Sequence, residues 1–292
     1  MSVDTGFELC PGLVLKNRIM AASGCTGWGD ALQDFTDQAL FGAIFTPTVT
    51  ILPREGNPMP RTGETPAGLL YSTGLPNPGL DMFLSENLPH IAHIQSPVIV
   101  SIIAETPDDW MKLASDIGSA PGVDGIEMNL TPIQLQICSE EIRRLPSEAE
   151  WCTTMHESIV AVRGVYAGPL LAKIPSVTVE PGLAASVVVE AGADVVSVGQ
   201  ALPATAVRAN GTRRFSGVAG LSGPAIKPYT LYCTWRARMH VQEPIVASGG
   251  ILTSQDAEEY FGAGATAIAV GVANLVHPDI LPSLLSVSQK SI

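Results

Sequence analysis

Two glycine-containing clusters late in the chain have the composition of a phosphate-binding site. Ser248-Gly249-Gly250 directly follows the apolar run Pro244–Ala247, and Gly271-Val272-Ala273 follows the apolar run Thr266–Val270. Glycine lets backbone N–H groups approach a bound anion closely, and a helix that begins beside it adds the positive end of its dipole. We therefore expect a phosphate-bearing cofactor or substrate here, with plain turns as the alternative.

Lys173 is the most conspicuous single residue, because it ends the apolar run Pro169-Leu-Leu-Ala-Lys. A cation in such a place is costly to bury unless a partner or ligand compensates its charge. Three interpretations stay open: a salt-bridged lysine at a rim, a charge that faces an anionic ligand, or an amine for Schiff-base chemistry.

Small polar residues and glycines also follow the other apolar runs of the chain. They offer hydrogen-bonding groups at the ends of these runs rather than within them. They are Ser23, Gly24, Thr46, Thr48, Ser101, Asn129, Thr131, Ser197 and Gln200.

Eight such runs alternate with longer amphipathic stretches and predict an α/β fold, a (β/α)8 TIM barrel. Near-continuous apolar runs are typical of parallel strands buried on both faces. A doubly wound open sheet is the alternative, but it usually has fewer strands. The active sites of TIM barrels lie at the C-terminal ends of the strands, so the polar residues and Lys173 should converge on one rim. The predicted strands are Arg18–Ala22, Ala43–Thr46, Pro97–Ile103, Gly125–Asn129, Pro169–Ile174, Asp194–Val198, Pro244–Ala247 and Thr266–Val270.

Two stretches, Thr48–Leu88 and Gln200–Lys227, are too long to be simple connections between these units. Both carry little helical pattern, and long ordered loops in compact domains are commonly functional. We find no linker, repeat or charge run that divides the chain. Residues 1–292 are therefore expected to form one barrel domain.

Composition narrows the class of protein further. The chain has 292 residues, of which 46% are hydrophobic, with 16 Lys and Arg against 28 Asp and Glu, a net charge of −12. This acidity argues against a nucleic-acid partner, and no apolar run reaches the length of a membrane span. Five scattered cysteines without a C-x-x-C pair suit reduced thiols and give no metal framework. We expect a cytoplasmic protein with no metal ion.

Seven stretches match a known family. They are Leu15-Lys-Asn-Arg-Ile-Met-Ala-Ala-Ser-Gly-Cys, Pro53-Arg-Glu-Gly-Asn-Pro, Glu64-Thr-Pro-Ala-Gly, Gly74-Leu-Pro-Asn-Pro-Gly, Ala120-Pro-Gly-Val-Asp, Gly220-Leu-Ser-Gly-Pro-Ala-Ile-Lys-Pro and Ala247-Ser-Gly-Gly-Ile. On these stretches the chain resembles the dihydroorotate dehydrogenase family, especially its class 1 enzymes that work with an electron-transfer partner. The resemblance runs from about Phe7 to Ile280.

The resemblance implies FMN as the cofactor, a homodimer and an electron-transfer partner protein. Lys173 matches the family lysine beside the flavin pyrimidine edge, where a cation stabilises negative charge on the reduced ring. The implied FMN contacts are Ser23, Gly24, Thr46, Ser101, Asn129, Lys173, Ser197, Gly223, Gly249, Gly250, Gly271 and Val272.

The orotate-binding part of the family pattern is altered in this chain. Family members carry a catalytic cysteine or serine in the loop after strand four, and here Pro132 stands in that place. Pro47 stands where the family has a lysine, and Tyr71 replaces an asparagine. Amide-rich recognition of orotate would lose most of its partners. We expect Thr48, Tyr71, Gln134 and Gln200 to contact the substrate instead.

A replacement for the missing base can be sought among several residues. We expect Tyr71, Thr131 and Lys173 to be catalytic, with Tyr71 as the preferred proton donor because a phenol above a flavin can deliver a proton in an alkene reduction. Cys138, Ser139, Glu140 and His156 lie in or beyond the altered loop and are weaker candidates.

The preferred hypothesis is an FMN-dependent oxidoreductase. It would act on a CH–CH or C=C bond next to a carbonyl in a small cyclic substrate other than orotate, and specialised metabolism is where such an enzyme is expected. The alternatives are a genuine dihydroorotate dehydrogenase of pyrimidine biosynthesis with an unusual base, a non-catalytic flavin-binding homologue, and a flavin-free lyase or aldolase that uses Lys173 as a Schiff base.

Overall fold

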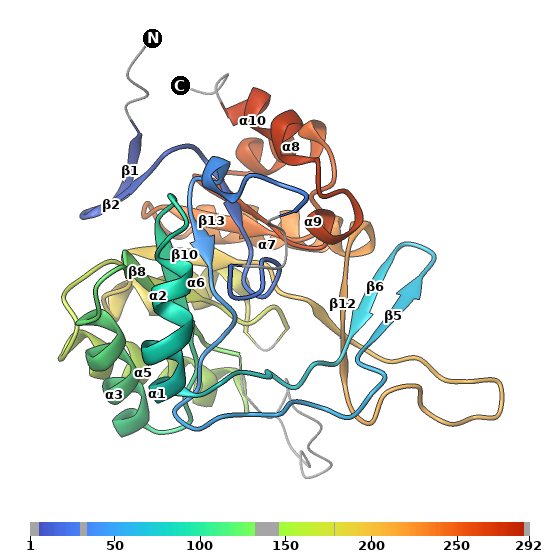
Figure 1. The fold of residues 1–292 in the computed structure, drawn as a ribbon, viewed down its shortest axis with the longest axis horizontal. Helices are drawn as coiled ribbons and strands as arrows, with labels where there is room; N and C mark the ends of the chain where they lie inside the picture. Colours follow the sequence, from blue (N-terminus) through green and yellow to red (C-terminus); the bar gives the residue numbers. More distant parts are fainter. Residues whose placement is uncertain (1–5, 30–33, 132–145, 178, 289–292) are drawn as a thin grey trace.

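The eight apolar runs form a closed parallel barrel, which confirms the predicted α/β TIM barrel (Figure 1). Around the barrel the strands follow the order β10-β13-β14-β3-β4-β7-β8-β9. Each strand agrees with its predicted boundaries to within one residue. The strands are β3 (Ile19–Ala21), β4 (Ile44–Phe45), β7 (Val98–Ile102), β8 (Gly125–Asn129), β9 (Leu170–Lys173), β10 (Val195–Val198), β13 (Ile245–Ser248) and β14 (Ala267–Val270).

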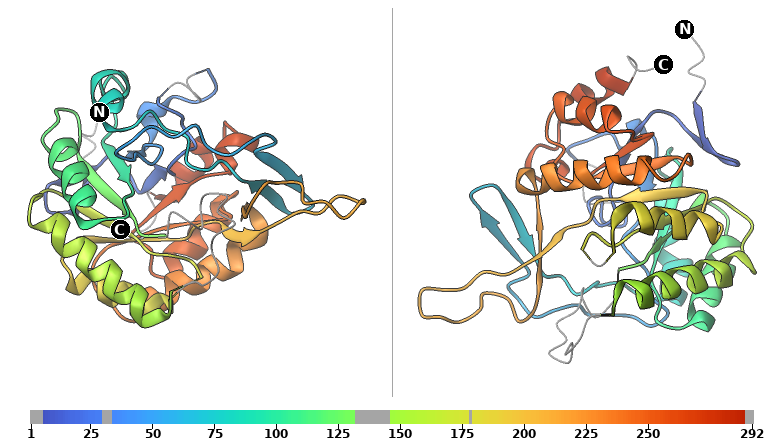
Figure 2. Two further views of the ribbon diagram at one scale, coloured as in Figure 1. Left: turned by 90° about the horizontal axis from the view of Figure 1, so that it is seen from below. Right: turned by 180° about the vertical axis from the view of Figure 1, so that it is seen from behind.

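The computed structural model describes residues 6–29, 34–131, 146–177 and 179–288. Helices surround the barrel and cover the outward faces of its strands (Figure 2). The longer helices are α3 (Pro107–Gly118), α5 (Glu148–Arg163), α6 (Pro181–Glu190), α7 (Lys227–Arg238), α8 (Ser254–Gly262) and α10 (Leu281–Ser288). The short ones are η1 (Gln38–Leu40), α1 (Leu80–Met82), η2 (Phe83–Asn87), α2 (Leu88–Ile91), η3 (Pro224–Ile226) and α9 (Ala273–Val276).

Local signals in the sequence fix where the outer helices begin. Ser147 and Glu150 form a capping box at the start of α5, in which each side chain bonds to the other's backbone N–H. Thr253 and Asp256 do the same for α8. Such caps satisfy N–H groups that have no partner within the helix. The start of α8 therefore holds the segment that follows β13 in place.

The N-terminal end of the barrel is closed by an antiparallel hairpin, β1 (Phe7–Cys10) and β2 (Leu13–Leu15). Leu9, Leu13 and Leu15 are buried against residues of the barrel strands, including Met20 and Leu171. Side chains that face inward fill a barrel of this size completely. A ligand can therefore enter only from the opposite, C-terminal end.

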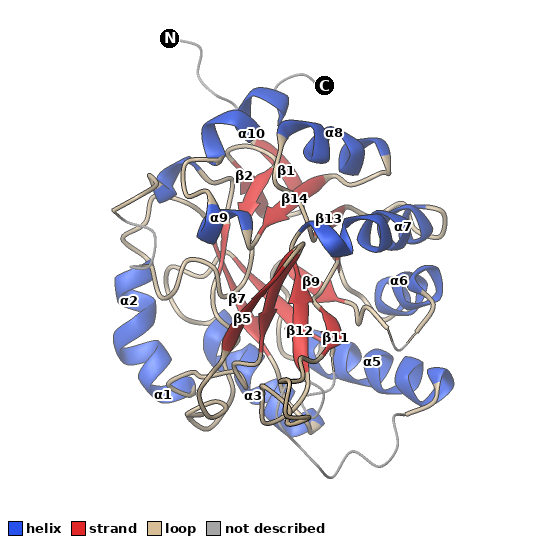
Figure 3. Ribbon diagram, turned by 90° about the vertical axis from the view of Figure 1, so that its right-hand side faces the viewer, coloured by secondary structure: helices blue, strands red, loops and turns tan. Residues whose placement is uncertain are grey.

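The two long segments meet above the C-terminal end and form a second sheet (Figure 3). The first contributes the hairpin β5 (Thr62–Thr65) and β6 (Gly68–Tyr71), and the second contributes β11 (Leu202–Ala204) and β12 (Ala219–Ser222). The order is β11-β12-β6-β5, and every neighbouring pair is antiparallel. Segments nearly 150 residues apart in the chain thus build one wall over the barrel mouth.

Within the described part of the chain, no helix combines the length and the apolar character that crossing a bilayer requires.

Candidate active site

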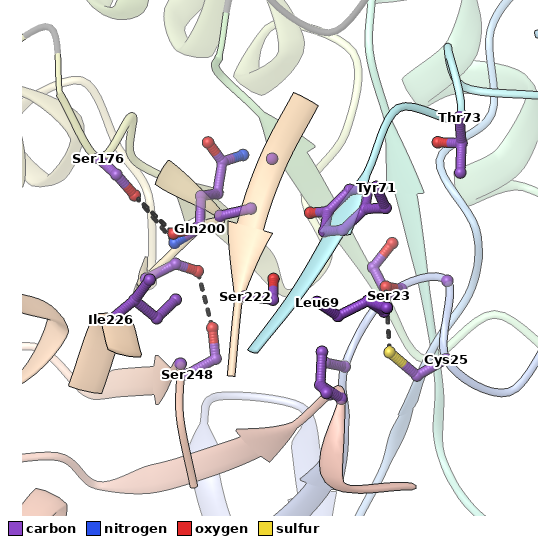
Figure 4. Close-up of a pocket in the computed structure, with 18 of the residues that line it drawn as sticks. Ser23, Cys25, Leu69, Tyr71, Thr73, Ser176, Gln200, Ser222, Ile226 and Ser248 are labelled. Carbon is purple, nitrogen blue, oxygen red and sulfur yellow. Dashed lines mark hydrogen bonds between the residues drawn. The ribbon is translucent and has the colours of Figure 1, made fainter. Parts of the chain in front are cut away.

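A cavity of about 600 Å³ opens at the C-terminal end of the barrel, beneath the second sheet (Figure 4). Its size lies in the usual range for cofactor and substrate pockets. Loops after the barrel strands form its floor and sides, and β6 and β12 form one wall. The predicted residues that line it are Ser23, Gly24, Thr48, Tyr71, Asn129, Thr131, Lys173, Gln200, Gly223, Gly249, Gly250, Gly271 and Val272.

Glycine is required at one end of this cavity because the backbone comes too close to its neighbours for a side chain. Gly249 has a φ of +117°, and a Cβ placed on it would lie 2.8 Å from Thr230. Gly250 has a φ of +68°, and its Cβ would lie 2.8 Å from the carbonyl oxygen of Gly223. The backbone after β13 borders the cavity directly, at the place where the sequence predicts a phosphate cradle.

Buried hydroxyl groups hold this loop from behind. Tyr260 on α8 donates a hydrogen bond to the carbonyl oxygen of Gly249 at 2.6 Å. The Tyr260 oxygen in turn accepts a hydrogen bond from the hydroxyl of Thr230 on α7, and both side chains are fully buried. The loop is therefore anchored to the scaffold through residues of two helices.

Lys173 provides the charge of the site. It is the one charged residue among those that line the cavity in the described part of the chain. Its Nζ lies 3.5 Å from Oε1 of Glu127, a residue of the neighbouring strand β8. Glu127 is a buried acidic residue that sequence reasoning missed, because it lies in the middle of a strand that otherwise reads as a core segment.

A chain of polar side chains crosses the floor of the cavity between the loops after β8 and β10. The side-chain amide of Gln200 donates to Oδ1 of Asn129 at 2.8 Å and accepts a hydrogen bond from Thr131. The backbone N–H of Gln200 donates to the hydroxyl of Ser176 at 2.9 Å. Three predicted site residues, Asn129, Thr131 and Gln200, are thus brought together in one network.

Tyr71 extends from β6 into the cavity opposite the barrel floor (Figure 4). Gly220 on β12 makes room for its ring, since a Cβ there would lie 3.2 Å from the ring carbon Cζ. Burial, together with nearby Cys25, raises the pKa of the Tyr71 phenol to about 12, although a hydrogen bond with Ser222 opposes the shift. The phenol therefore keeps its proton at neutral pH.

Three residues predicted to contact the cofactor do not line the cavity in the described part of the chain. Thr46, Ser101 and Ser197 are almost completely buried. The backbone N–H of Ser101 donates to Thr46, and the Ser101 hydroxyl bonds to Thr48, which does line the cavity. Thr46 and Ser101 thus support the lining instead of forming it. Pro132, Gln134, Cys138, Ser139 and Glu140 lie outside the described residues.

Several lining residues were not predicted as site residues. Cys25 and Trp28 follow β3, and Leu69 and Ser222 belong to the second sheet. Burial raises the pKa of the Cys25 thiol to about 11, whereas the positive charge of Lys173 opposes the shift. The position of Cys25 directly after Ser23-Gly24 was the available signal for it. No sequence signal marked Leu69 and Ser222, because they come together only when two strands far apart in the chain pair.

Comparisons with known proteins agree on one family. A family profile described as dihydroorotate dehydrogenase matches residues 8–286. The chain is 36% identical to the dihydroorotate dehydrogenase B (NAD(+)) catalytic subunit of Geobacillus kaustophilus, over 94% of this chain and 87% of the relative. It is 36% identical to the subunit of the same name from Desulforudis audaxviator, over 95% and 89%. The one from Geotalea uraniireducens is 37% identical, over 91% and 86%.

Proposed function

Because this chain belongs to the dihydroorotate dehydrogenase family, we propose that it binds FMN and acts on a CH–CH or C=C bond next to a carbonyl in a small cyclic substrate. The observation that carries this proposal is the single cavity in which the glycine loops, Lys173 and Tyr71 meet. A backbone that can bind an anion, a cation and a proton donor are groups that suit a protein to such a reaction.

The residues present fit FMN. Gly249, Gly250 and Gly223 line the cavity without side chains, so their backbone can approach a phosphate closely. A Cβ on any of them would instead meet neighbouring protein atoms behind the loop. Gly271 and Val272 border the same cavity next to the short helix α9, an arrangement typical of phosphate sites in TIM barrels. Ser23, Gly24 and Asn129 would complete the contacts to the cofactor.

Bound FMN would supply hydride transfer, and the chain's own residues would supply position and charge. Lys173 would stabilise negative charge on the pyrimidine edge of the cofactor. The phenol of Tyr71 would donate a proton to the substrate carbon in reduction. Gln200, held by Asn129 and Thr131, would orient the substrate by hydrogen bonds. The sheet above the cavity would keep water out.

Dihydroorotate is the substrate that the relatives favour. All three relatives named above carry dihydroorotate dehydrogenase in their names, and each aligns over more than nine-tenths of this chain. In this candidate function the chain is a genuine dihydroorotate dehydrogenase of pyrimidine biosynthesis, and a group other than a cysteine at position 132 serves as the base.

A second candidate function, with an uncharged cyclic substrate, is favoured by the cavity lining. Orotate and dihydroorotate carry a carboxylate, and a buried carboxylate needs a cationic partner. Lys173 is the one charged lining residue in the described part of the chain, and it already faces Glu127. Pro47 and Tyr71 add apolar surface where the family pattern has a lysine and an asparagine.

Anaerobic rapid mixing distinguishes the two candidates. The FMN-loaded protein is mixed with dihydroorotate, and the flavin absorbance is followed. Complete bleaching within seconds, with orotate as the product, would establish the first candidate. The second candidate would be established if dihydroorotate left the spectrum unchanged while neutral compounds reacted with the flavin. Saturated cyclic imides would bleach the oxidised flavin, or cyclic enones would reoxidise the reduced flavin.

The remaining assignments are also part of this proposal. The relatives are named as catalytic subunits of an NAD(+) enzyme, which supports an electron-transfer partner subunit for this chain. We further propose a homodimer, a cytoplasmic location and a single domain over residues 1–292. Size-exclusion chromatography with light scattering, alone and with a co-expressed partner, measures both forms of assembly.

A further inference from the structure

The buried carboxylate of Glu127 lies one layer below the cavity floor. Asn129 on β8 pairs in register with Lys173 on β9, and Glu127 lies two residues earlier on the same strand. Side chains two residues apart on a strand point to the same face. Glu127 therefore points toward the same side of the barrel wall as Asn129 and Lys173, but deeper. Its side chain is 3% exposed, against 17% for Lys173.

The contact between the two residues is unlike a normal buried ion pair. Nζ of Lys173 lies 3.5 Å from Oε1 of Glu127, and this buried oxygen accepts no hydrogen bond from any described residue. By contrast, Nζ of Lys227 donates a hydrogen bond to Oδ1 of Asp256 at only 2.5 Å. Among the described residues, Glu127 thus holds the lysine ammonium by charge rather than by a hydrogen bond, so the ammonium can donate hydrogen bonds to a group in the cavity.

Stability does not explain an acidic residue at this position. A buried ion pair seldom stabilises a fold more than apolar residues of the same size, and a buried carboxylate oxygen without a hydrogen bond is costly. The neighbours of Glu127 along the strand, Ile126 and Met128, are fully buried apolar residues. A polar group that weakens the core beside a cavity is expected where the site requires it.

We propose that Glu127 is a positioning residue that holds the Lys173 ammonium at the cavity floor and partly offsets its charge. This inference rests on the proposed function, in which Lys173 faces the flavin. The free energy by which Lys173 favours the reduced, negatively charged flavin is then limited by the carboxylate behind it. Glu127 thereby sets the relative affinities of the protein for oxidised and reduced FMN.

The first test uses flavin-free protein and does not depend on the proposed function. Urea denaturation midpoints are compared for the wild type, Glu127→Gln, Lys173→Met and the double variant. Lys173→Met alone should lower the midpoint, because it leaves a buried carboxylate without a cation. Adding Glu127→Gln should restore part of the loss. The matched control is Lys112→Met, which removes an exposed pair with Asp116 and should change little. Additive effects of the two cavity substitutions would overturn the pairing.

The second test measures the dissociation constants of oxidised and reduced FMN for the same four proteins. Glu127→Gln should strengthen the binding of reduced FMN relative to that of oxidised FMN by about tenfold, a difference of about 1.4 kcal/mol. In the Lys173→Met background the same substitution should have little effect. An unchanged ratio in Glu127→Gln would overturn the tuning role. If no variant binds FMN, the proposed function fails, and the urea experiment still decides whether Glu127 holds Lys173.

Discussion

At the scale of single residues, the cavity contains a phenol, that of Tyr71, which resists ionisation. Burial raises the pKa of Tyr71 to about 12, so the hydroxyl stays protonated throughout the range in which enzymes are usually assayed. Ser222 keeps it oriented through a hydrogen bond. A group with these properties is suited to donate a proton and poorly suited to act as a free anionic base.

We therefore predict that Tyr71→Phe slows flavin-dependent reduction of a substrate double bond by about 10²-fold or more, the usual contribution of a proton-transfer group. FMN affinity should stay within about twofold of the wild type. Single-turnover stopped-flow absorbance measures the rate, and Tyr232→Phe on the exposed face of α7 is the control. A wild-type rate in Tyr71→Phe would show that Tyr71 only lines the pocket.

The same phenol gives an expectation for pH dependence. Because its pKa is raised to about 12, ionisation of Tyr71 should not lower the reduction rate as the pH increases from 7 to 10. A rate that falls tenfold between pH 8 and pH 9 in the wild type, but not in Tyr71→Phe, would contradict this assignment. Stopped-flow traces across a buffer series provide the measurement.

At the scale of structural elements, the loop after β13 is the part of the site with the least freedom to vary. Its backbone is fixed by the positive φ of Gly249 and by the Tyr260 hydroxyl, which donates to the Gly249 carbonyl oxygen and is itself bonded to Thr230. The capping box of α8 anchors the other end of the segment. A change of a few tenths of an ångström here moves the whole proposed phosphate cradle.

We predict that Gly249→Ala lowers FMN affinity by at least about tenfold and destabilises the fold by about 1–3 kcal/mol. The added Cβ would meet Thr230 at 2.8 Å in a conformation that alanine rarely adopts. Gly262→Ala at the end of α8 is the matched control, because a Cβ there meets nothing within 4 Å. FMN titration and urea denaturation test both variants. Equal FMN affinity in Gly249→Ala and the control would exclude the cradle.

The barrel and the second sheet differ in how well they can be predicted from sequence. Each barrel strand is a local apolar run next to an amphipathic stretch, so its existence and boundaries follow from neighbouring residues. Lys173 and Gly249 could be placed at the rim for the same reason. The strands of the second sheet are short and half-buried, and they pair across long separations. Their sequences are rich in glycine and proline. The one feature of the sequence that pointed to additional structure there was the unusual length of the two segments.

Glu127 shows a different limit of prediction. Its position on a strand was correctly predicted, yet nothing in the sequence distinguishes an acidic residue that faces a lysine from one that faces solvent. That distinction needs the register between β8 and β9, which is set by the closure of the whole barrel. Tyr71 was found only through its place in a family pattern, since its strand was not predicted.

At the scale of the whole molecule, buried thiol and phenol groups make the stability of the fold depend on pH in the alkaline range. Burial raises the pKa of Cys10 and Tyr166 to about 12 and that of Cys233 to about 11, above the ordinary values of 9.0 for thiols and 10.0 for phenols. All three groups keep their protons to a higher pH in the folded chain than in the unfolded chain. Their contribution is complete below pH 9 and is lost as the pH rises toward 12.

We predict that the free energy of unfolding falls above pH 9. The slope should reach about 1.4 kcal/mol per pH unit for each group that ionises only in the unfolded chain. Urea denaturation in reducing buffer from pH 8 to pH 11 measures this dependence. Cys10→Val removes one titrating group and should make the fall shallower by about that amount. Constant stability up to pH 11 would contradict the burial of these groups.

The visible absorption spectrum of the freshly purified protein shows whether this barrel carries FMN. We predict flavin bands, with FMN as the chromophore released on denaturation. We also predict that Gly249→Ala is purified with less flavin than Gly262→Ala. A colourless protein that leaves the spectrum and fluorescence of added FMN unchanged would contradict these predictions.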